Sequence, residues 1–276
     1  MRVQRLSAFS EGDTGGNPAG VVLLPSLPEA AVMQAVAAEV GYSETAFAAP
    51  EGEAWRVRYF APAMEVPFCG HATIALGAAL ARHAGDGVYH LRLNAAEITV
   101  EGRREGELFA AALQSPPTGS VAAPSDLVAA SLALFGYAGA ELDPRIPPAI
   151  AEAGARHLVL ALRDRARLRA MTYDLETGRA LMNEAGLVTI MLVVAEARDR
   201  FWARNAFAAG GVLEDPATGA AAAAFAGYLR DLGWPHGPAI LIAQGDDMGM
   251  PSRLHAEIPP ARGVSIRVSG TARAIV

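Results

Sequence analysis

Lysine is absent from this chain of 276 residues, so all 23 of its basic residues are arginine. A Schiff base, an attached pyridoxal phosphate and a P-loop each require a lysine amine. A single cysteine, Cys69, cannot form an internal disulfide, a four-cysteine zinc site, an iron–sulfur cluster or a two-cysteine proton-transfer pair. Enzymes that depend on any of these groups are therefore excluded for the chain alone.

Long apolar runs are also missing. Hydrophobic residues make up 52% of the chain, yet no stretch approaches the roughly 20 uninterrupted apolar residues of a membrane-spanning helix. The N-terminal segment alternates like a strand and lacks the pattern of a signal peptide. The net charge is −6 and both signs are interspersed, so no basic patch exists for nucleic acid or an anionic membrane. These absences favour a globular, cytoplasmic protein that acts on a small molecule.

The six histidines show no HxxxH or HxH spacing. Because zinc sites commonly draw their ligands from such short spacings, the sequence predicts no dedicated metal site. Nothing in the pattern calls for a bound cofactor either.

Hydrophobic periodicity and turn residues predict a mixture of strands and helices. The expected strands are residues 3–9, 19–24, 45–49, 55–61, 88–94, 97–103, 107–113, 157–162, 188–196 and 201–209. The expected helices are residues 28–40, with an acid in the first turn and Gly41 just past the end, 70–82, and 125–134 with Ser125 as cap. The helix at 70–82 is apolar on nearly all sides, so it should be buried.

The best linker in the sequence is the Pro- and Gly-rich segment 114–124. It predicts two domains, residues 1–118 and 119–276, of which the first can also include the extreme C-terminal strand. Both lengths are ordinary for a domain. The active site is expected in the cleft between them.

A repeat relates the two halves. Glu65-Val-Pro-Phe-Cys-Gly70 and Glu214-Asp-Pro-Ala-Thr-Gly219 share Glu, Pro and Gly at a constant offset of 149 (214 − 65, 216 − 67 and 219 − 70). Each turn opens an alanine-rich helix, and the two helices are expected to end together at Leu80 and Leu229. We interpret this match as an internal duplication.

Such a turn presents free backbone N–H groups and the positive end of a helix dipole, which together favour an anion. Two such helices pointing at one cleft can hold a carboxylate and stabilise the enolate-like charge left when a neighbouring carbon loses a proton. The inserted side chains differ, because Cys69 and His71 flank the first glycine whereas Asp215 and Thr218 precede the second. In the first helical turn, His71 is expected to be a neutral imidazole.

Five motifs in order resemble the phenazine biosynthesis PhzF-like family over essentially the whole chain. They are Gly16-Asn-Pro-Ala-Gly20, Ser43-Glu-Thr-Ala-Phe47, Glu65-Val-Pro-Phe-Cys-Gly-His-Ala-Thr73, Glu214-Asp-Pro-Ala-Thr-Gly219 and Gln244-Gly-Asp-Asp-Met-Gly249. The resemblance implies a diaminopimelate epimerase-like α/β (α+β) fold with two pseudo-symmetric domains, each a curled sheet around a central helix. It also implies a homodimer.

The family's acid/base glutamate corresponds to Glu44, and its two residues that contact polar groups of the substrate correspond to His71 and Asp215. A carboxylate at the start of a strand in an apolar cleft is also suited on physical grounds to accept and return a proton. The motifs supply further expected substrate-binding residues, which are Asn17, Ser43, Gly70, Thr218, Gly219 and Ala220. The resemblance thus implies a cofactor-free isomerase that moves a proton on a small carboxylate.

Two positions depart from the family pattern. Family isomerases carry a serine where this chain has Ala220, and losing that hydroxyl removes a hydrogen bond of about 1–3 kcal/mol. The family's late Gly-Arg-Pro-Ser reads Gly-Met-Pro-Ser here, so Met250 replaces a charge, with Arg253 following as a candidate substitute. A related small carboxylate therefore fits at least as well as the phenazine precursor.

Two alternatives remain open from the sequence. One is an amino-acid epimerase or racemase, in which Glu44 and Cys69 act from opposite faces of the substrate. The other is a noncatalytic metabolite-binding protein, which the changes at Ala220 and Met250 suggest and the presence of Glu44, His71 and Asp215 opposes.

Overall fold

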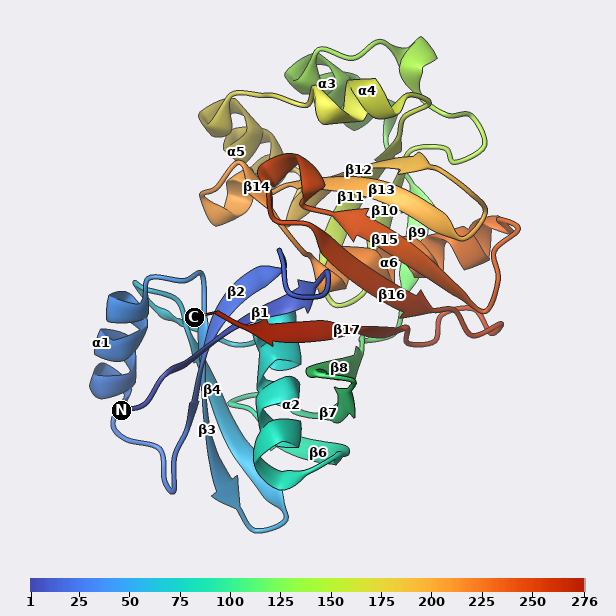
Figure 1. Ribbon diagram of the computed structural model, residues 1–276. Helices are drawn as coiled ribbons and strands as arrows, with labels where there is room; N and C mark the ends of the chain where they lie inside the picture. The colour runs from blue at the N-terminus through green and yellow to red at the C-terminus, as the bar shows by residue number, and fades with distance from the viewer. Residues whose placement is uncertain (276) are drawn as a thin grey trace. The chain divides into compact units, whose positions relative to one another are not determined.

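The computed structural model describes residues 1–275 and divides into two compact units (Figure 1). Unit 1 comprises Met1–Gln114 and the C-terminal segment from Ser269, and unit 2 comprises Ser115–Val268. No helix among residues 1–275 is both long and apolar enough to cross a membrane.

Unit 1 is a curled sheet with one helix inside it and one outside. Its elements are β1 (Gln4–Ser10), β2 (Asn17–Leu23), α1 (Ala30–Val40), β3 (Thr45–Glu51), β4 (Ala54–Phe60), β5 (Glu65–Val66), α2 (Gly70–Ala84), β6 (Gly87–Arg92), β7 (Glu97–Glu105), β8 (Leu108–Gln114) and most of β17 (Arg267–Ala274). β17 pairs with both β1 and β8, so the sheet closes around α2.

Unit 2 has the same kind of sheet with a larger outer helical layer. Its elements are β9 (Gly119–Ala122), α3 (Ser125–Phe135), η1 (Gly139–Glu141), β10 (Ala149–Glu152), β11 (Arg156–Ala161), α4 (Arg165–Arg169), α5 (Leu175–Glu184), β12 (Thr189–Ala195), β13 (Arg200–Ala206), η2 (Ala208–Gly210), β14 (Glu214–Asp215), α6 (Gly219–Leu232), β15 (Ala239–Gln244), η3 (Asp246–Met248) and β16 (Ser252–Glu257). In Figure 1, α3, α4 and α5 lie on the opposite face of the sheet from α6.

The strand pairings confirm the predicted duplication. In unit 1, β2–β3 is parallel, β3–β4 antiparallel and β4–β6 parallel. Unit 2 repeats this sequence of pairings in β11–β12, β12–β13 and β13–β15. The two central helices begin at Gly70 and Gly219, so they keep the offset of 149 found in the sequence. The predicted pseudo-symmetric α/β fold is therefore confirmed.

Small residues let the central helix α2 pack closely within its sheet. The whole span from His71 to Ala81 is buried, as its all-round apolar sequence predicts, and it contacts β1, β2, β7 and β8. A Cβ atom on Gly102 of β7 would lie 2.3 Å from the carbonyl oxygen of Gly77. Only glycine fits at this approach, because any side chain would push the strand away from the helix.

Apolar side chains on the other sheet face hold the outer helices. In unit 1, Met33 and Ala37 of α1 pack on Val22, Phe47 and Phe60 from three strands. In unit 2, α3, α4 and α5 cover a larger cluster that includes buried residues of β11 and β12. Each unit therefore has helices packed on both faces of its sheet.

Several local predictions were wrong. The two units divide between Gln114 and Ser115, at the start of the expected linker, but that segment also contains β9, which pairs antiparallel with β10. Ser125 is the first residue of α3, and Pro124 precedes it at the cap without a side-chain hydrogen bond. The first turn of α1 contains no acid, because Glu29 stands one position before the helix. The central helices run past the expected ends, to Ala84 and Leu232.

The duplication is broken at one buried polar position. Phe60 of β4 pairs with Glu65 of the first turn, and Ala206 of β13 pairs with Glu214 of the second turn. Tyr59 and Asn205 stand directly before these two strand residues, so they occupy equivalent positions. The Tyr59 hydroxyl lies 2.7 Å from Thr73 Oγ1 of α2, and burial raises the pKa of this phenol. The position equivalent to Thr73 in α6 is Ala222 (73 + 149), and neither side-chain atom of the fully buried Asn205 amide has a hydrogen-bond partner among the described residues.

We therefore expect Asn205→Val to increase the free energy of unfolding by about 1–2 kcal/mol, since a buried amide without a partner retains its desolvation cost. Valine also suits a strand. Urea unfolding followed by circular dichroism measures the change. As a control, Asn205→Asp should destabilise the protein because it buries a charge. A loss of stability in the valine variant would show that the amide is satisfied in the folded protein.

Candidate active site

The glutamate of the first turn is held by an arginine on the preceding strand. Arg58 donates from Nε and Nη2 to the two carboxylate oxygens of Glu65, at 2.7 and 2.6 Å, and Asn94 donates to Oε1 at 2.6 Å. The hydrogen bond from Arg58 is the largest cause that lowers the pKa of Glu65, and the one from Asn94 lowers it further. The backbone of Glu65 pairs with Phe60, two residues after Arg58. This ion pair fixes the turn on β4.

The second turn repeats this arrangement more deeply in the protein. Glu214 pairs with Ala206 of β13, and Arg204, again two residues earlier, forms a bidentate ion pair with its carboxylate. The side chains of Arg204 and Glu214 are only 11% and 5% exposed. Arg204 Nη1 also donates to the carbonyls of Arg169 and Met171, at 2.9 and 3.2 Å. The two motif glutamates are thus structural residues, a role that the motif comparison alone did not reveal.

Cys69 and His71 lie together at the start of α2. Cys69 occupies the N-cap position in extended conformation, and no side chain caps this helix. The N-terminal N–H groups and the dipole of a 15-residue helix therefore favour an anion in front of them. Cys69 Sγ lies 3.4 Å from His71 Nδ1 and 3.9 Å from Nε2.

The segment before β3 brings Ser43 and Glu44 to the same imidazole. Glu44 Oε2 lies 3.4 Å from His71 Nε2, and Ser43 Oγ lies 3.3 Å from it. The Gly20 amide donates to the Glu44 carbonyl at 3.1 Å, which fixes this segment to the middle of β2. Ser43, Glu44, Gly70 and His71, predicted from separate motifs, are thus brought together in unit 1.

The His71 imidazole lies next to three polar side chains, those of Ser43, Glu44 and Cys69. Ser43 Oγ and Cys69 Sγ lie within hydrogen-bonding reach of the two ring nitrogens, which can donate or accept according to the tautomer. The Glu44 carboxylate lies against this imidazole, and its side chain keeps 21% of its surface exposed. A partly exposed carboxylate held at a helix N-terminus can exchange a proton with a bound molecule.

Asn17 lies elsewhere in the same sheet. It opens β2 opposite Ala8 of β1 and is 3% exposed. Its expected role in substrate binding stays a prediction.

The second turn contains a separate hydrogen-bond network in unit 2. Thr218 Oγ1 donates to Asp215 Oδ2 at 2.5 Å, and it accepts from Gln244 Nε2 at 3.1 Å. Gln244 Nε2 also donates to the Asp215 carbonyl at 2.6 Å. This fully buried glutamine therefore fixes the Asp215 side chain through Thr218. The motif comparison included Gln244 without predicting this positioning role.

Gly245, next to this glutamine, allows a close approach to the turn. Its φ is +80°, and a Cβ atom would lie 2.8 Å from the Pro216 carbonyl oxygen. Gly219 and Ala220 then begin α6, which has no side-chain cap. The second turn thus also presents a helix N-terminus beside a carboxylate.

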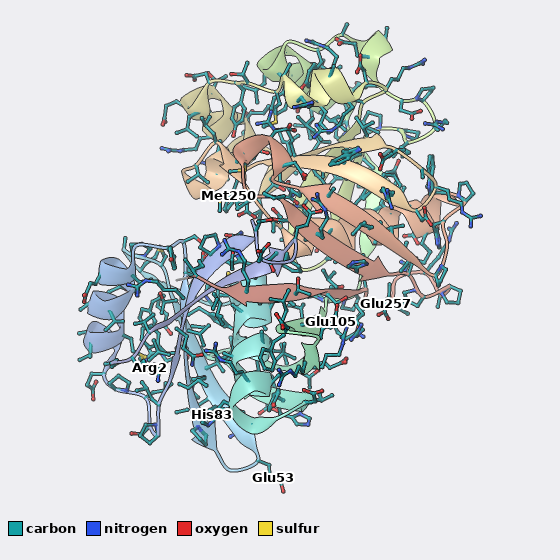
Figure 2. The ribbon with its side chains drawn as sticks, in the orientation of Figure 1. Arg2, Glu53, His83, Glu105, Met250 and Glu257 are labelled. Atoms are coloured by element: carbon teal, nitrogen blue, oxygen red, sulfur yellow. The ribbon has the colours of Figure 1, made fainter. Side chains whose placement is uncertain are left out.

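The candidate substitute for the missing family arginine, Arg253, is paired with an acid of the late motif. Met250 lies in the turn that leads into β16 (Figure 2). Arg253 makes two hydrogen bonds of 2.9 Å to the Asp246 carboxylate, and its guanidinium lies 5.9 Å from the centre of the Trp202 ring. The positive charge of Arg253 is therefore balanced by Asp246.

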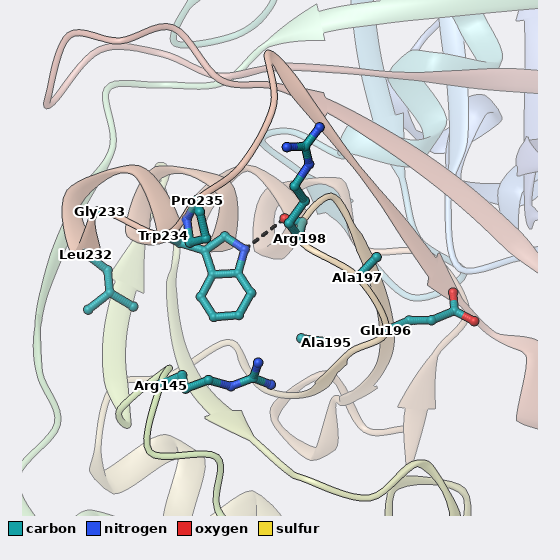
Figure 3. A pocket seen from close by; sticks show the side chains of 9 residues that line it. All are labelled: Arg145, Ala195, Glu196, Ala197, Arg198, Leu232, Gly233, Trp234 and Pro235. Atoms are coloured by element: carbon teal, nitrogen blue, oxygen red, sulfur yellow. Dashed lines mark hydrogen bonds between the residues drawn. The ribbon is translucent and has the colours of Figure 1, made fainter.

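A surface pocket of about 470 Å³ in unit 2 contains none of the predicted site residues (Figure 3). Trp234 forms part of its wall and donates from Nε1 to the Arg198 carbonyl at 2.8 Å. Arg145 lies over the same indole, 5.4 Å from the ring centre. This pocket is therefore separate from the residues that the motifs predict.

Comparisons with known proteins agree with this architecture. The family model described as phenazine biosynthesis-like protein matches residues 6–276. The trans-2,3-dihydro-3-hydroxyanthranilate isomerase of Pseudomonas aeruginosa is 32% identical over 273 residues, which cover 96% of this chain and 91% of that protein. The crystal structure of a PhzF-family phenazine biosynthesis protein from Bacillus anthracis superposes with a TM-score of 0.85 at 22% identity, covering 100% and 98% of the two chains.

A more distant structure shares the fold alone. A probable proline racemase from Agrobacterium radiobacter K84 matches with a TM-score of 0.65 at 11% identity, covering 99% of this chain and 90% of that one. The structures show an α/β fold with the epimerase-like duplicated architecture, and the family model with the isomerase relatives shows an enzyme of the isomerase class. The chain belongs to the phenazine biosynthesis-like (PhzF) family.

Proposed function

We propose that this enzyme moves a proton between two carbons of a small carboxylate substrate by acid/base catalysis, without a cofactor. The observation that carries the proposal is Glu44 Oε2 lying 3.4 Å from His71 Nε2 at the uncapped start of α2. The family's isomerase relatives support the same class of reaction.

In the proposed reaction, Glu44 removes a proton from a carbon activated by a neighbouring carboxylate or double bond and returns it to another carbon. His71 and Asp215 bind polar groups of the substrate, and the helix N-termini at the two turns stabilise the developing negative charge. Further substrate contacts are proposed for Asn17, Ser43, Gly70, Thr218, Gly219 and Ala220. One carboxylate suffices because a proton shift on one face needs a single base that acts twice.

The epimerase alternative requires Glu44 and Cys69 to act from opposite faces of one carbon. Each reacting atom would then lie about 3 Å from the carbon, so the two would be separated by about 6 Å. The ligand atoms of Glu44, Cys69 and His71 all lie within 4.8 Å of one another. This short separation supports the one-carboxylate reaction over a two-base racemisation.

A ligand screen followed by turnover tests the proposal. Chelator-treated protein is first screened by thermal shift against cyclohexadiene acids, amino acids and other small carboxylates. The stabilising ligands, together with trans-2,3-dihydro-3-hydroxyanthranilate, are then incubated with the enzyme and followed by NMR, with no cofactor added. The expected result is a positional isomer of one ligand. Ligands that bind tightly without any change would favour the noncatalytic metabolite-binding alternative.

Ala220→Ser is expected to increase kcat/KM for trans-2,3-dihydro-3-hydroxyanthranilate by about 10-fold, since one restored hydrogen bond is worth about 1–3 kcal/mol. The added hydroxyl would stand at the start of α6, where an anion is favoured. Steady-state kinetics of the two proteins provide the measurement, and Ala221→Ser, one position further along, is the matched control. If Ala220→Ser has the same kcat/KM as the parent enzyme, residue 220 does not contribute to substrate binding.

A further inference from the structure

Three different metal-binding groups converge in unit 1 outside any expected metal motif. The thiol of Cys69, the imidazole of His71 and the carboxylate of Glu44 place their ligand atoms within 4.8 Å of one another. We propose that these residues form a binding site for a thiophilic divalent cation, with Zn²⁺ as the probe, and that the bound cation inhibits the enzyme. Sulfur, nitrogen and oxygen ligands of these kinds are the set that zinc prefers.

The distances are close to those of a tetrahedral zinc site. Zinc bonds of about 2.0–2.3 Å at tetrahedral angles separate ligand atoms by about 3.3–3.6 Å. His71 Nε2 lies 3.4 Å from Glu44 Oε2 and 3.9 Å from Cys69 Sγ. The Glu44–Cys69 pair is bounded only by the 4.8 Å limit that covers all three ligand atoms, so side-chain shifts of up to about an ångström would bring the three atoms around one cation.

The local structure already holds the ligands near this arrangement. Cys69 and His71 are fixed by the first turn of the buried helix α2, and Glu44 is anchored through its backbone to β2. The Cys69 and His71 residues are 9% and 8% exposed, and the Glu44 side chain is 21% exposed. A cation can approach from the Glu44 side, and a fourth position is left for water or a carboxylate ligand.

Charge also balances at the proposed site. The Cys69 S–H bond breaks as the sulfur–metal bond forms, and the proton leaves to the buffer. The resulting thiolate and the Glu44 carboxylate together carry two negative charges, which neutralise a divalent cation.

Histidine spacing in the sequence could not predict this site, because the ligands are a Cys-x-His pair and a glutamate 25 residues before the cysteine (69 − 44).

The inhibition rests on the proposed function, whereas the metal binding does not. A cation held by Glu44 occupies the lone pair that would otherwise accept the substrate proton. It also neutralises the carboxylate that acts as the base. The enzyme should therefore lose activity in stoichiometric Zn²⁺ and regain it when a chelator is added.

Metal binding is tested on the chelator-treated full chain in the absence of substrate. Competition with a chromophoric chelator is expected to give one Zn²⁺ per chain with a dissociation constant of micromolar or below, and no competition from Mg²⁺. Co²⁺ should give a near-ultraviolet sulfur-to-metal band, which can come only from Cys69 because the chain has no other cysteine. Cys69→Ser should remove that band and weaken Zn²⁺ binding by about 100-fold.

Matched variants locate the cation. Glu44→Gln should weaken Zn²⁺ binding, whereas Glu53→Gln and His90→Asn, at exposed positions of unit 1, should leave it unchanged. A Zn²⁺ affinity of Cys69→Ser equal to that of the parent protein, or Co²⁺ binding without the sulfur-to-metal band, would overturn the proposed site. If the parent protein binds Zn²⁺ tightly but Glu44→Gln keeps full activity, the proposed function is contradicted and the metal site still stands.

Discussion

Glu44→Gln is expected to lower kcat by a factor on the order of a thousand, because the amide cannot accept the substrate proton. The substitution preserves size and hydrogen-bonding capacity, so KM and the melting temperature should change little. Steady-state kinetics on the substrate found by the ligand screen measure the effect. Glu53→Gln, which makes the same chemical change on an exposed turn, is the control and should keep the parental rate.

The comparison with His71 separates proton transfer from positioning. His71→Asn keeps a donor near Glu44 but removes the imidazole that lies between Glu44 and Cys69. A smaller loss of kcat than in Glu44→Gln fits a residue that orients the base and binds the substrate. If Glu44→Gln retained more than about a tenth of the parental kcat, Glu44 could not be the general base that the proposed reaction requires.

Arg204→Ala is expected to lower the free energy of unfolding by about 3–5 kcal/mol, because it leaves the buried Glu214 carboxylate without its partner. The same change also removes the donors to the Arg169 and Met171 carbonyls. Urea unfolding with a tryptophan fluorescence readout measures the loss. The double variant Arg204→Met, Glu214→Leu should recover most of it, since a well-packed apolar pair can replace a buried ion pair.

Arg58→Ala provides the matched control in unit 1. The side chains of Arg58 and Glu65 are 22% and 27% exposed, so water can solvate the carboxylate that remains. Removing the Arg58 side chain should lower the free energy of unfolding by about 1 kcal/mol or less, as for partly exposed ion pairs. Equal losses in Arg58→Ala and Arg204→Ala would contradict the conclusion that burial makes the second turn depend more strongly on its ion pair.

Local sequence signals predicted the elements that surround the two turns. The central helices begin at Gly70 and Gly219. At both positions the sequence signal is a glycine that follows a proline-containing turn and precedes an alanine-rich stretch. The all-round apolar pattern of α2 predicted its burial for the same local reason. The cluster of Ser43, Glu44 and His71 was also predictable, but only through the family motifs.

Other features depend on which distant strands pair. The four residues of β9 carry no strand pattern of their own, and only the ladder with β10 makes them sheet. The Arg204–Glu214 ion pair follows from the register of β13 with β14, which composition does not encode. Likewise, the distance between Cys69 and Glu44 is set by the packing of β2, β3 and α2, so the sequence alone did not predict a three-ligand cluster.

Isotope exchange tests the central claim, that Glu44 transfers a substrate proton, most directly. The parent enzyme and Glu44→Gln are each incubated with the identified substrate in deuterium oxide, and deuterium is located in substrate and product by NMR. We predict that the parent enzyme incorporates deuterium at the carbons that lose and gain the proton, because the partly exposed Glu44 carboxyl exchanges its proton with solvent between the two transfers. Glu44→Gln should bind the substrate with similar affinity and incorporate none. Exchange at the parental rate in Glu44→Gln would contradict the account.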